Sequence, residues 1–405
     1  MGEKTIPSVV NENRKTLLRV AVISTSAIAY FASIVNPILG ELSLAFPDAD
    51  PVIVRSAATL PSAMLLVFSF VSERITRICG KRKVLLMATG FMFVGGIAPA
   101  FFGGLGFILV MRLVYGIGYG MGYPLAIASI MDYFIGAERV VLIGRNTGIG
   151  AVIGIFLQLL GGYLATVTWR CAFLGYFLVS VVFLLVFFGY PRTDENGFVS
   201  RRAAPDAKTG GARLEALSLF FAILSFFTSV GIWAFYTNVA IVCTQESIAN
   251  SVGASVILSV YPLMTFIVGL VFGPIFARLR YYSGSIGLLL LGLGFLFLSG
   301  AHRFSLFVCI SVMMGIGFGL YFSAIQLAIG AVVKNPQSMP IAVSSRAFCM
   351  GLGQFTSPYV MTLLTQIADV PGGRGEWKIA MGICLAASLS MFLVSKYKIE
   401  LTTQK

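Results

Sequence analysis

An arginine followed by three tyrosines is the most chemically suggestive pattern in this sequence. Arg112 precedes Tyr115, Tyr119 and Tyr123 by three, seven and eleven residues. At about 100° of rotation per residue, the four side chains share one face of a helix. An ionisable group inside an apolar segment is costly and marks function by default. We therefore expect this face to line a cavity and bind a solute; the alternative is a structural arginine bonded to backbone carbonyls and tyrosine hydroxyls.

Carboxylates are missing from the middle of every apolar segment of the sequence. Glu41 and Asp132 lie closest to a segment interior, and either could exchange protons only if a helix end is shifted. Asp132 could instead pair with Arg139 or Arg145. The sequence has one histidine, His302, and six cysteines, none of them in a CxxC spacing. These residues do not form the pattern of a metal site or a catalytic triad. We expect no metal, no cofactor and no enzymatic activity.

The composition indicates what must position these residues. Hydrophobic residues make up 58% of the 405 positions and charged residues 11%, whereas a soluble domain is nearer half apolar and a quarter charged. Mean hydropathy is +0.91. Lipid is therefore the expected surrounding. We attribute the net charge of +13 to basic residues that meet lipid headgroups, not to nucleic-acid binding.

Apolar segments of bilayer length recur along the chain. A helix needs about 20 apolar residues to cross a bilayer. The sequence predicts twelve such helices, at 17–39, 52–71, 84–102, 107–131, 143–165, 171–190, 217–239, 252–276, 282–299, 306–333, 341–367 and 379–394.

Lysine and arginine gather in alternate segments between these helices. The segments on the side of the termini contain most of them, and the other side has only Arg55, Arg170, Arg303, Arg374 and Lys378. Segments rich in Lys and Arg face the cytoplasm. Both termini are therefore expected in the cytoplasm, and the compact loops suggest a bacterial cytoplasmic (cell inner) membrane.

An internal repeat divides the chain. Gly-Ile-Gly-Tyr-Gly at 116–120 recurs as Gly-Ile-Gly-Phe-Gly at 315–319, and Arg145 recurs as Arg346. The offset of about half the chain indicates a duplicated six-helix unit, and parallel repeats of this kind enclose a central site. We predict an all-α membrane protein with two pseudo-symmetric six-helix bundles, at 1–190 and 214–405, joined by a cytoplasmic segment at 191–213.

Three motifs resemble those of the major facilitator superfamily. Residues 72–83, Ser-Glu-Arg-Ile-Thr-Arg-Ile-Cys-Gly-Lys-Arg-Lys, are similar to the family's loop motif Gly-x-x-x-Asp-Arg-x-Gly-Arg-Lys. Arg-x-x-x-Gly-x-Gly-x-Gly at 112–120 resembles its fourth-helix motif, and Trp-Arg-x-x-Phe at 169–173 its entry into the sixth helix. The resemblance covers the whole chain. Arg77 stands where the loop motif has Asp, and Ala277 replaces the corresponding Asp of the second half, so the gate charges must be altered.

The resemblance also implies roles for further residues. Helices that line the path in this family carry further candidate cavity residues: Tyr30, Asn36, Trp233, Tyr236, Asn238, Tyr321 and Gln326. For the aromatic residues among them, the alternative is helix packing or a place in the interfacial belt. The residues expected to gate the cytoplasmic side are Glu73, Arg77, Asp132, Arg145, Arg278 and Arg346. Arg346 would pair with Glu73 when that side closes, or bind substrate.

The pattern is closest to bacterial drug and metabolite efflux members of the family. It implies a secondary transporter that moves a small organic solute by alternating access, with proton-coupled export of drug-like or amphiphilic metabolites. The deep Arg112 and the lack of a central acid favour an alternative, an organic-anion transporter or exchanger that uses Arg112 as the substrate-binding cation. The expected partners are the solute, the bilayer and a coupling proton or counter-solute, and the expected state is a monomer.

Overall fold

The first half of the chain is a set of long helices with a few short irregular ones. The computed structural model describes residues 12–134, 136–191, 215–333 and 338–396, without the side chains of 12–15, 127, 136–141, 143–147 and 340. The helices of this half are α1 (Glu12–Ser24), the 3₁₀ helices η1 (Thr25–Ala29) and η2 (Phe31–Ile38), α2 (Leu39–Ala45), α3 (Pro51–Cys79), α4 (Lys81–Phe101), α5 (Leu105–Tyr133), α6 (Gly136–Leu164), α7 (Trp169–Ala172), η3 (Phe173–Phe177) and α8 (Leu178–Gly189).

The second half repeats this organisation. Its helices are α9 (Ala216–Gln245), α10 (Ser251–Leu270), α11 (Phe272–Leu279), α12 (Tyr282–Gly300), α13 (Phe304–Val332), α14 (Met339–Ile367) and α15 (Gly373–Val394). The described residues contain no strand. The expected linker at 191–213 falls, apart from residue 191, outside the described residues.

The helices are long enough to cross a bilayer. Within the described residues, ten spans have the required length and hydropathy, and the first of them, Thr16–Ala45, joins α1, η1, η2 and α2. Two further helices, α6 and α14, have 29 residues each. With these two, the number of spans matches the twelve expected. The all-α membrane architecture predicted from the apolar segments is confirmed.

One boundary differs clearly from the prediction. The loop expected after residue 71 is a single residue, Gly80, because α3 continues to Cys79 and α4 begins at Lys81. No glycine or proline interrupts residues 62–79, and an ion pair between Glu73 and Arg77, one turn apart, supports the extra turns. Gly80 has a φ of 81°, a conformation that glycine adopts without steric cost.

Equivalent glycines place the helices at equivalent contacts in the two halves. A Cβ atom on Gly118 of α5 would lie 2.2 Å from the carbonyl oxygen of Ala88 in α4. A Cβ atom on Gly317 of α13 would lie 2.7 Å from the carbonyl oxygen of Gly287 in α12. Small residues let helix backbones approach this closely. The repeated glycine motif therefore has the same packing role in both halves.

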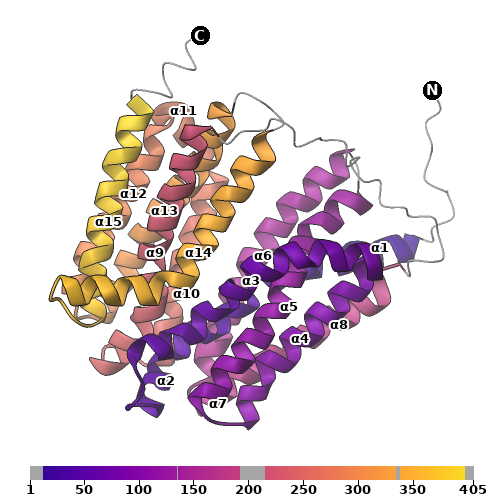
Figure 1. The fold of residues 1–405 in the computed structure, drawn as a ribbon, viewed down its shortest axis with the longest axis horizontal. Helices are drawn as coiled ribbons and strands as arrows, with labels where there is room; N and C mark the ends of the chain where they lie inside the picture. Colours follow the sequence, from indigo (N-terminus) through magenta and orange to yellow (C-terminus); the bar gives the residue numbers. More distant parts are fainter. Residues whose placement is uncertain (1–11, 135, 192–214, 334–337, 397–405) are drawn as a thin grey trace.

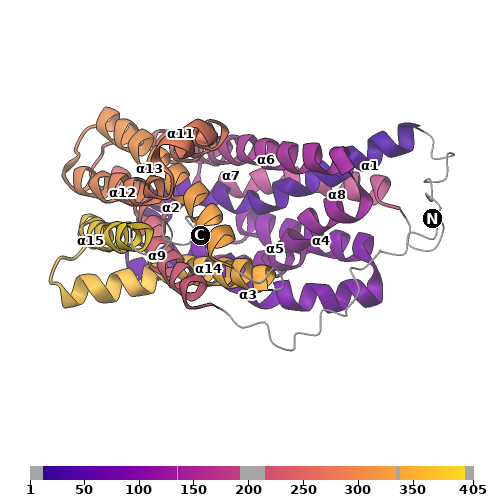
Figure 2. The same cartoon turned by 90° about the horizontal axis from the view of Figure 1, so that it is seen from above.

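The two bundles converge at one end and diverge at the other (Figure 1). They diverge toward the side on which α1 begins and α15 ends, called here the terminal side; the other end is the opposite side. Seen from above, α14 of the second bundle lies beside α3 of the first (Figure 2). Among the described residues, every hydrogen bond between the halves lies at the opposite side, including those of Arg55 and Ser56.

Candidate functional site

A cavity of about 780 Å³ lies between the two bundles. η1, η2, α5 and α6 contribute its wall from the first half, and α9, α10, α13 and α14 from the second. Aromatic side chains dominate the wall: Tyr30, Tyr119, Trp233, Tyr236, Tyr261, Phe266, Phe318, Tyr321 and Phe322. A mostly apolar, concave pocket shared by two structural units is the usual form of a small-molecule site.

The polar groups of this wall are uncharged. In the described part of the chain, no Asp, Glu, Lys, Arg or His lines the cavity. Its polar side chains are Ser33, Asn36, Gln158, Ser225, Thr228, Ser229, Thr265, Ser323 and Gln354. Gln158 Nε2 is buried without a hydrogen-bond partner among the described residues, as is the Tyr261 hydroxyl. The described part of the wall is therefore polar in places but carries no charge.

Six of the cavity residues expected from the sequence lie on this wall. They are Tyr30, Asn36, Tyr119, Trp233, Tyr236 and Tyr321. Gln158 and Gln354 also line the cavity. Tyr321 is fixed by its hydroxyl, which lies 2.9 Å from Thr228 Oγ1.

Arg112 lies inside the first bundle and not on the cavity wall, contrary to the expectation from its helix face. The residue is 0% exposed. Its Nε donates to the carbonyl oxygen of Ala57 in α3 at 3.0 Å, and its Nη1 donates to the hydroxyl of Tyr176 in η3 at 2.6 Å. The guanidinium carbon lies 4.6 Å from the centre of the Tyr115 ring. These are the contacts of the structural alternative.

The remaining expected cavity residues also lie off the wall. Tyr115 is fully buried and packs edge-on against Tyr176, because η3 covers the start of this face of α5. Tyr123 is 39% exposed beyond the cavity, and Gln326 is exposed. Asn238 belongs to a polar cluster at the opposite side. Only Tyr119, in the middle of the predicted stripe, reaches the solute space.

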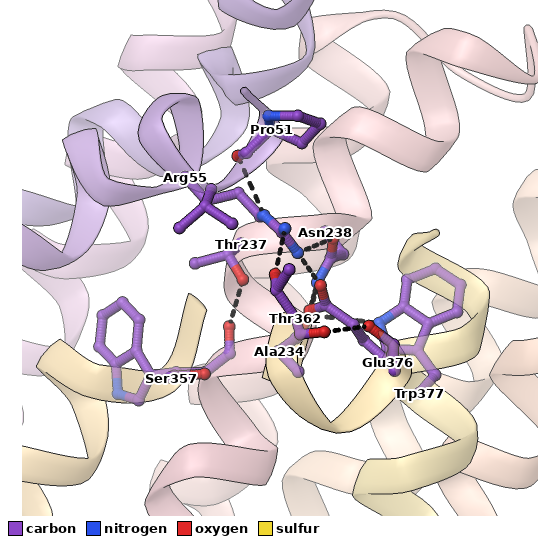
Figure 3. Close-up of polar contacts among 12 residues, drawn as sticks. Pro51, Arg55, Ala234, Thr237, Asn238, Ser357, Thr362, Glu376 and Trp377 are labelled. Carbon is purple, nitrogen blue, oxygen red and sulfur yellow. Dashed lines mark hydrogen bonds and ion pairs between the residues drawn. The ribbon is translucent and has the colours of Figure 1, made fainter. Parts of the chain in front are cut away.

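That polar cluster is a buried ion pair that joins the two halves (Figure 3). Arg55 of α3 pairs with Glu376 of α15, and their side chains are 6% and 3% exposed. Arg55 Nη2 donates to Thr362 Oγ1 of α14 at 2.9 Å, and Asn238 Nδ2 of α9 donates to Glu376 Oε2 at 2.7 Å. Next to the pair, Ser56 donates to the Tyr359 hydroxyl. The cluster therefore joins the two halves at the opposite side of the molecule.

This pair was not predicted from the sequence. Arg55 was expected among the charges outside the membrane, and Glu376 was expected to precede a helix at 379–394. The structure starts α15 six residues earlier, at Gly373, and places Arg55 in the second turn of α3. Arg55 already lies within the helix predicted at 52–71, and Pro51, which favours the first helical turn, supports a helix start before it; the position of Arg55 inside the helix was therefore available from the sequence.

Where their side chains are described, the residues expected to gate the terminal side form no ion pair across the halves. Glu73 pairs with Arg77 within α3, and Arg278 is exposed. Asp132, at the end of α5, pairs with Lys81 at the start of α4. The side chains of Arg139 and Arg145 lie outside the described residues. Arg346 is 4% exposed and has no ion pair among the described residues.

The sequence model of the Major Facilitator Superfamily matches residues 21–358. The chain belongs to the major facilitator superfamily. The chain has no significant match among curated proteins.

Solved structures of this family have the same fold. A bacterial homolog of the human lysosomal transporter Spinster, in an inward-facing and occupied conformation, has 14% identity over 96% of this chain and 98% of its own, with a TM-score of 0.75. Its unoccupied inward-facing form has 12% identity over 97% and 98%, with a TM-score of 0.73. The xylose transporter XylE from E. coli, in a partially occluded inward-open conformation, has 14% identity over 96% and 98%, with a TM-score of 0.70. At these identities the likeness concerns the fold.

Proposed function

We propose that this major facilitator protein is a secondary transporter that carries a small amphiphilic organic solute by alternating access. The observation that supports this most is the cavity itself, which both halves line and which is rich in aromatic side chains. Rocking two related bundles around such a site exposes it to each side of the membrane in turn. The uncharged amides and hydroxyls of the wall would orient the solute, and the rings would cover its apolar body.

The structure corresponds to the state in which the opposite side is closed. The Arg55–Glu376 cluster joins the halves there, and no described hydrogen bond joins them at the terminal side. Because Lys and Arg gather on the terminal side, we assign that side to the cytoplasm of a cell membrane. The inward-facing conformation of the Spinster homolog, named above, agrees with this assignment.

Proton-coupled export, expected from the motifs, stays a prediction. It needs an acid that titrates during the cycle, and the described cavity wall has none. Glu376 is buried and joins the two halves, so it is the candidate acid if protons drive transport. The organic-anion alternative through Arg112 lacks an accessible guanidinium in this state, because the side chain is enclosed by α3 and η3.

Transport of aromatic solutes by the reconstituted protein tests the proposal. Trp233 lines the cavity, and its ring packs against that of Tyr236. Replacing Trp233 by Ala removes ring contact with the solute, so we expect roughly a tenfold loss of uptake into proteoliposomes. The matched control is Phe102→Ala, because Phe102 is 63% exposed and is not among the residues that line the cavity. Equal uptake by the Trp233→Ala variant and the unaltered protein would contradict the proposal.

A further inference from the structure

Arg346 is a charged residue that lies next to the cavity wall on its terminal side. It precedes Met350 and Gln354 by four and eight residues on α14, and both of these line the cavity. Residues four apart lie on one helix face. The arginine therefore lies one turn beyond the wall, about 6 Å along the helix axis from Met350.

Contacts with ring faces hold the guanidinium against this wall. Its central carbon lies 5.1 Å from the centre of the Phe322 ring, and Phe322 lines the cavity. Tyr321 of the second half and Tyr123 of the first lie within electrostatic reach of the charge. A cation over an aromatic face is partly stabilised, so the Phe322 ring helps to hold the guanidinium in place.

The hydrogen-bonding groups of Arg346 are incompletely used. The residue is 4% exposed, and its Nε is buried without a hydrogen-bond partner among the described residues. No described carboxylate forms an ion pair with it. A buried guanidinium with a free donor is costly unless an anion meets it, and a planar guanidinium suits carboxylate, sulfonate and phosphate oxygens.

We propose that the cavity binds amphiphilic organic anions, with the apolar or aromatic body against the uncharged wall and the anionic group bonded to Arg346. This proposal rests on the proposed function, because it names the substrate class of the same cavity. The described residues of the wall offer no carboxylate to a cationic solute, and a cation near Arg346 is repelled. The site at Arg346 also differs from the anion site expected at Arg112, which lies inside the first bundle.

Binding of three probes with a shared ring system tests the charge preference. We would titrate the purified full chain in neutral detergent at pH 7 with 1-naphthylacetate, 1-naphthylacetamide and 2-(1-naphthyl)ethylammonium, an anion, a neutral amide and a cation. The unaltered protein is expected to bind the anion most tightly. Arg346→Gln should raise the Kd of the anion on the order of tenfold and leave that of the amide unchanged.

Two further variants separate charge from structure. Arg346→Lys keeps the positive charge and should keep part of the preference for the anion, and Arg278→Gln removes an exposed arginine and should change nothing. Unchanged amide binding shows that the Arg346→Gln variant is folded. The proposal is overturned if the ratio of the anion and amide Kd values is the same with and without Arg346, or if the cation binds more tightly than the anion.

Trp233→Ala distinguishes the two proposals. If it weakens all three probes while Arg346→Gln has no selective effect, the cavity is the binding site and only the anion assignment fails. If Trp233→Ala weakens none of them, the probes do not bind in the cavity and the proposed function fails as well. Absence of binding of all three probes to the unaltered protein would overturn both.

Discussion

At the scale of single residues, Arg112 shows how a buried charge can serve the fold. Its guanidinium links α5 to a carbonyl of α3 and to the Tyr176 hydroxyl of η3, and it lies over two tyrosine rings. Three elements of the first bundle thus meet at one side chain. The sequence shows that an arginine lies deep within an apolar segment. It does not show which side chain covers this arginine, because Tyr176 comes 64 residues later in the chain.

Replacement of Arg112 by Ala should therefore destabilise the protein. It leaves a void and an unpaired tyrosine hydroxyl inside the bundle, with an expected cost of about 3 kcal/mol. Thermal unfolding in detergent measures the loss, with exposed Arg278→Ala as the control. An unchanged melting temperature together with abolished transport would instead assign Arg112 to the substrate.

Arg55 and Glu376 show the limit of sequence reasoning at this scale. Both charges were visible, but each was placed outside the bilayer because it lies close to the end of an apolar segment. Their burial depends on contact with each other across 321 residues. No local sequence pattern indicates a contact between residues so far apart in the chain, so this ion pair could be recognised only in the structure.

At the scale of elements, the apolar segments predicted the helices and their order, because a bilayer demands length and hydrophobicity from each span. The ends were less predictable. α3 runs past its predicted end to Cys79, and α15 starts before its predicted start, at Gly373. A helix continues through polar residues until one such as Gly80 ends it. Which face of a helix meets the cavity also depends on packing: η3 covers part of the tyrosine face of α5.

The repeated glycines lead to a prediction for helix packing. Gly118→Ala would force a Cβ to within 2.2 Å of the Ala88 carbonyl oxygen, so α5 and α4 must separate and the melting temperature should fall by several degrees, reflecting about 1–3 kcal/mol of overpacking. Gly90→Ala in α4 is the matched control, since its Cβ would meet nothing within 4 Å. That variant should be neutral or slightly stabilising because alanine favours helix. Equal melting temperatures for the two variants would contradict the close packing.

At the scale of the whole molecule, two bundles line one cavity, and the hydrogen bonds that join them in the described residues lie at one side. The duplication predicted this arrangement, because two copies in the same orientation place equivalent helices around a common centre. It could not predict which side is closed, since closure depends on contacts between the halves. In the structure, Arg55 and Glu376 make the principal buried contact of that kind among the described residues.

Glu376→Gln should therefore shift the molecule toward opening at the opposite side. Loss of one partner of a buried ion pair costs about 3–5 kcal/mol, which is enough to change the populations of two states. A matched control is Glu246→Gln. Glu246 pairs with Arg374 at the same side, and the hydrogen bonds from Arg374 hold its pKa below the usual range, but both residues belong to the second half.

Spin-label distances across the two sides of the molecule test the account most directly. Labels at Asp48 and Ser305 would report on the opposite side, and labels at Arg74 and Arg278 on the terminal side, in a chain whose native cysteines are replaced. In Glu376→Gln, the first distance should lengthen while the second shortens, and Glu246→Gln should leave both as they are. If Glu376→Gln leaves both distances unchanged, or lengthens both, the two halves do not alternate around this cavity in the way described.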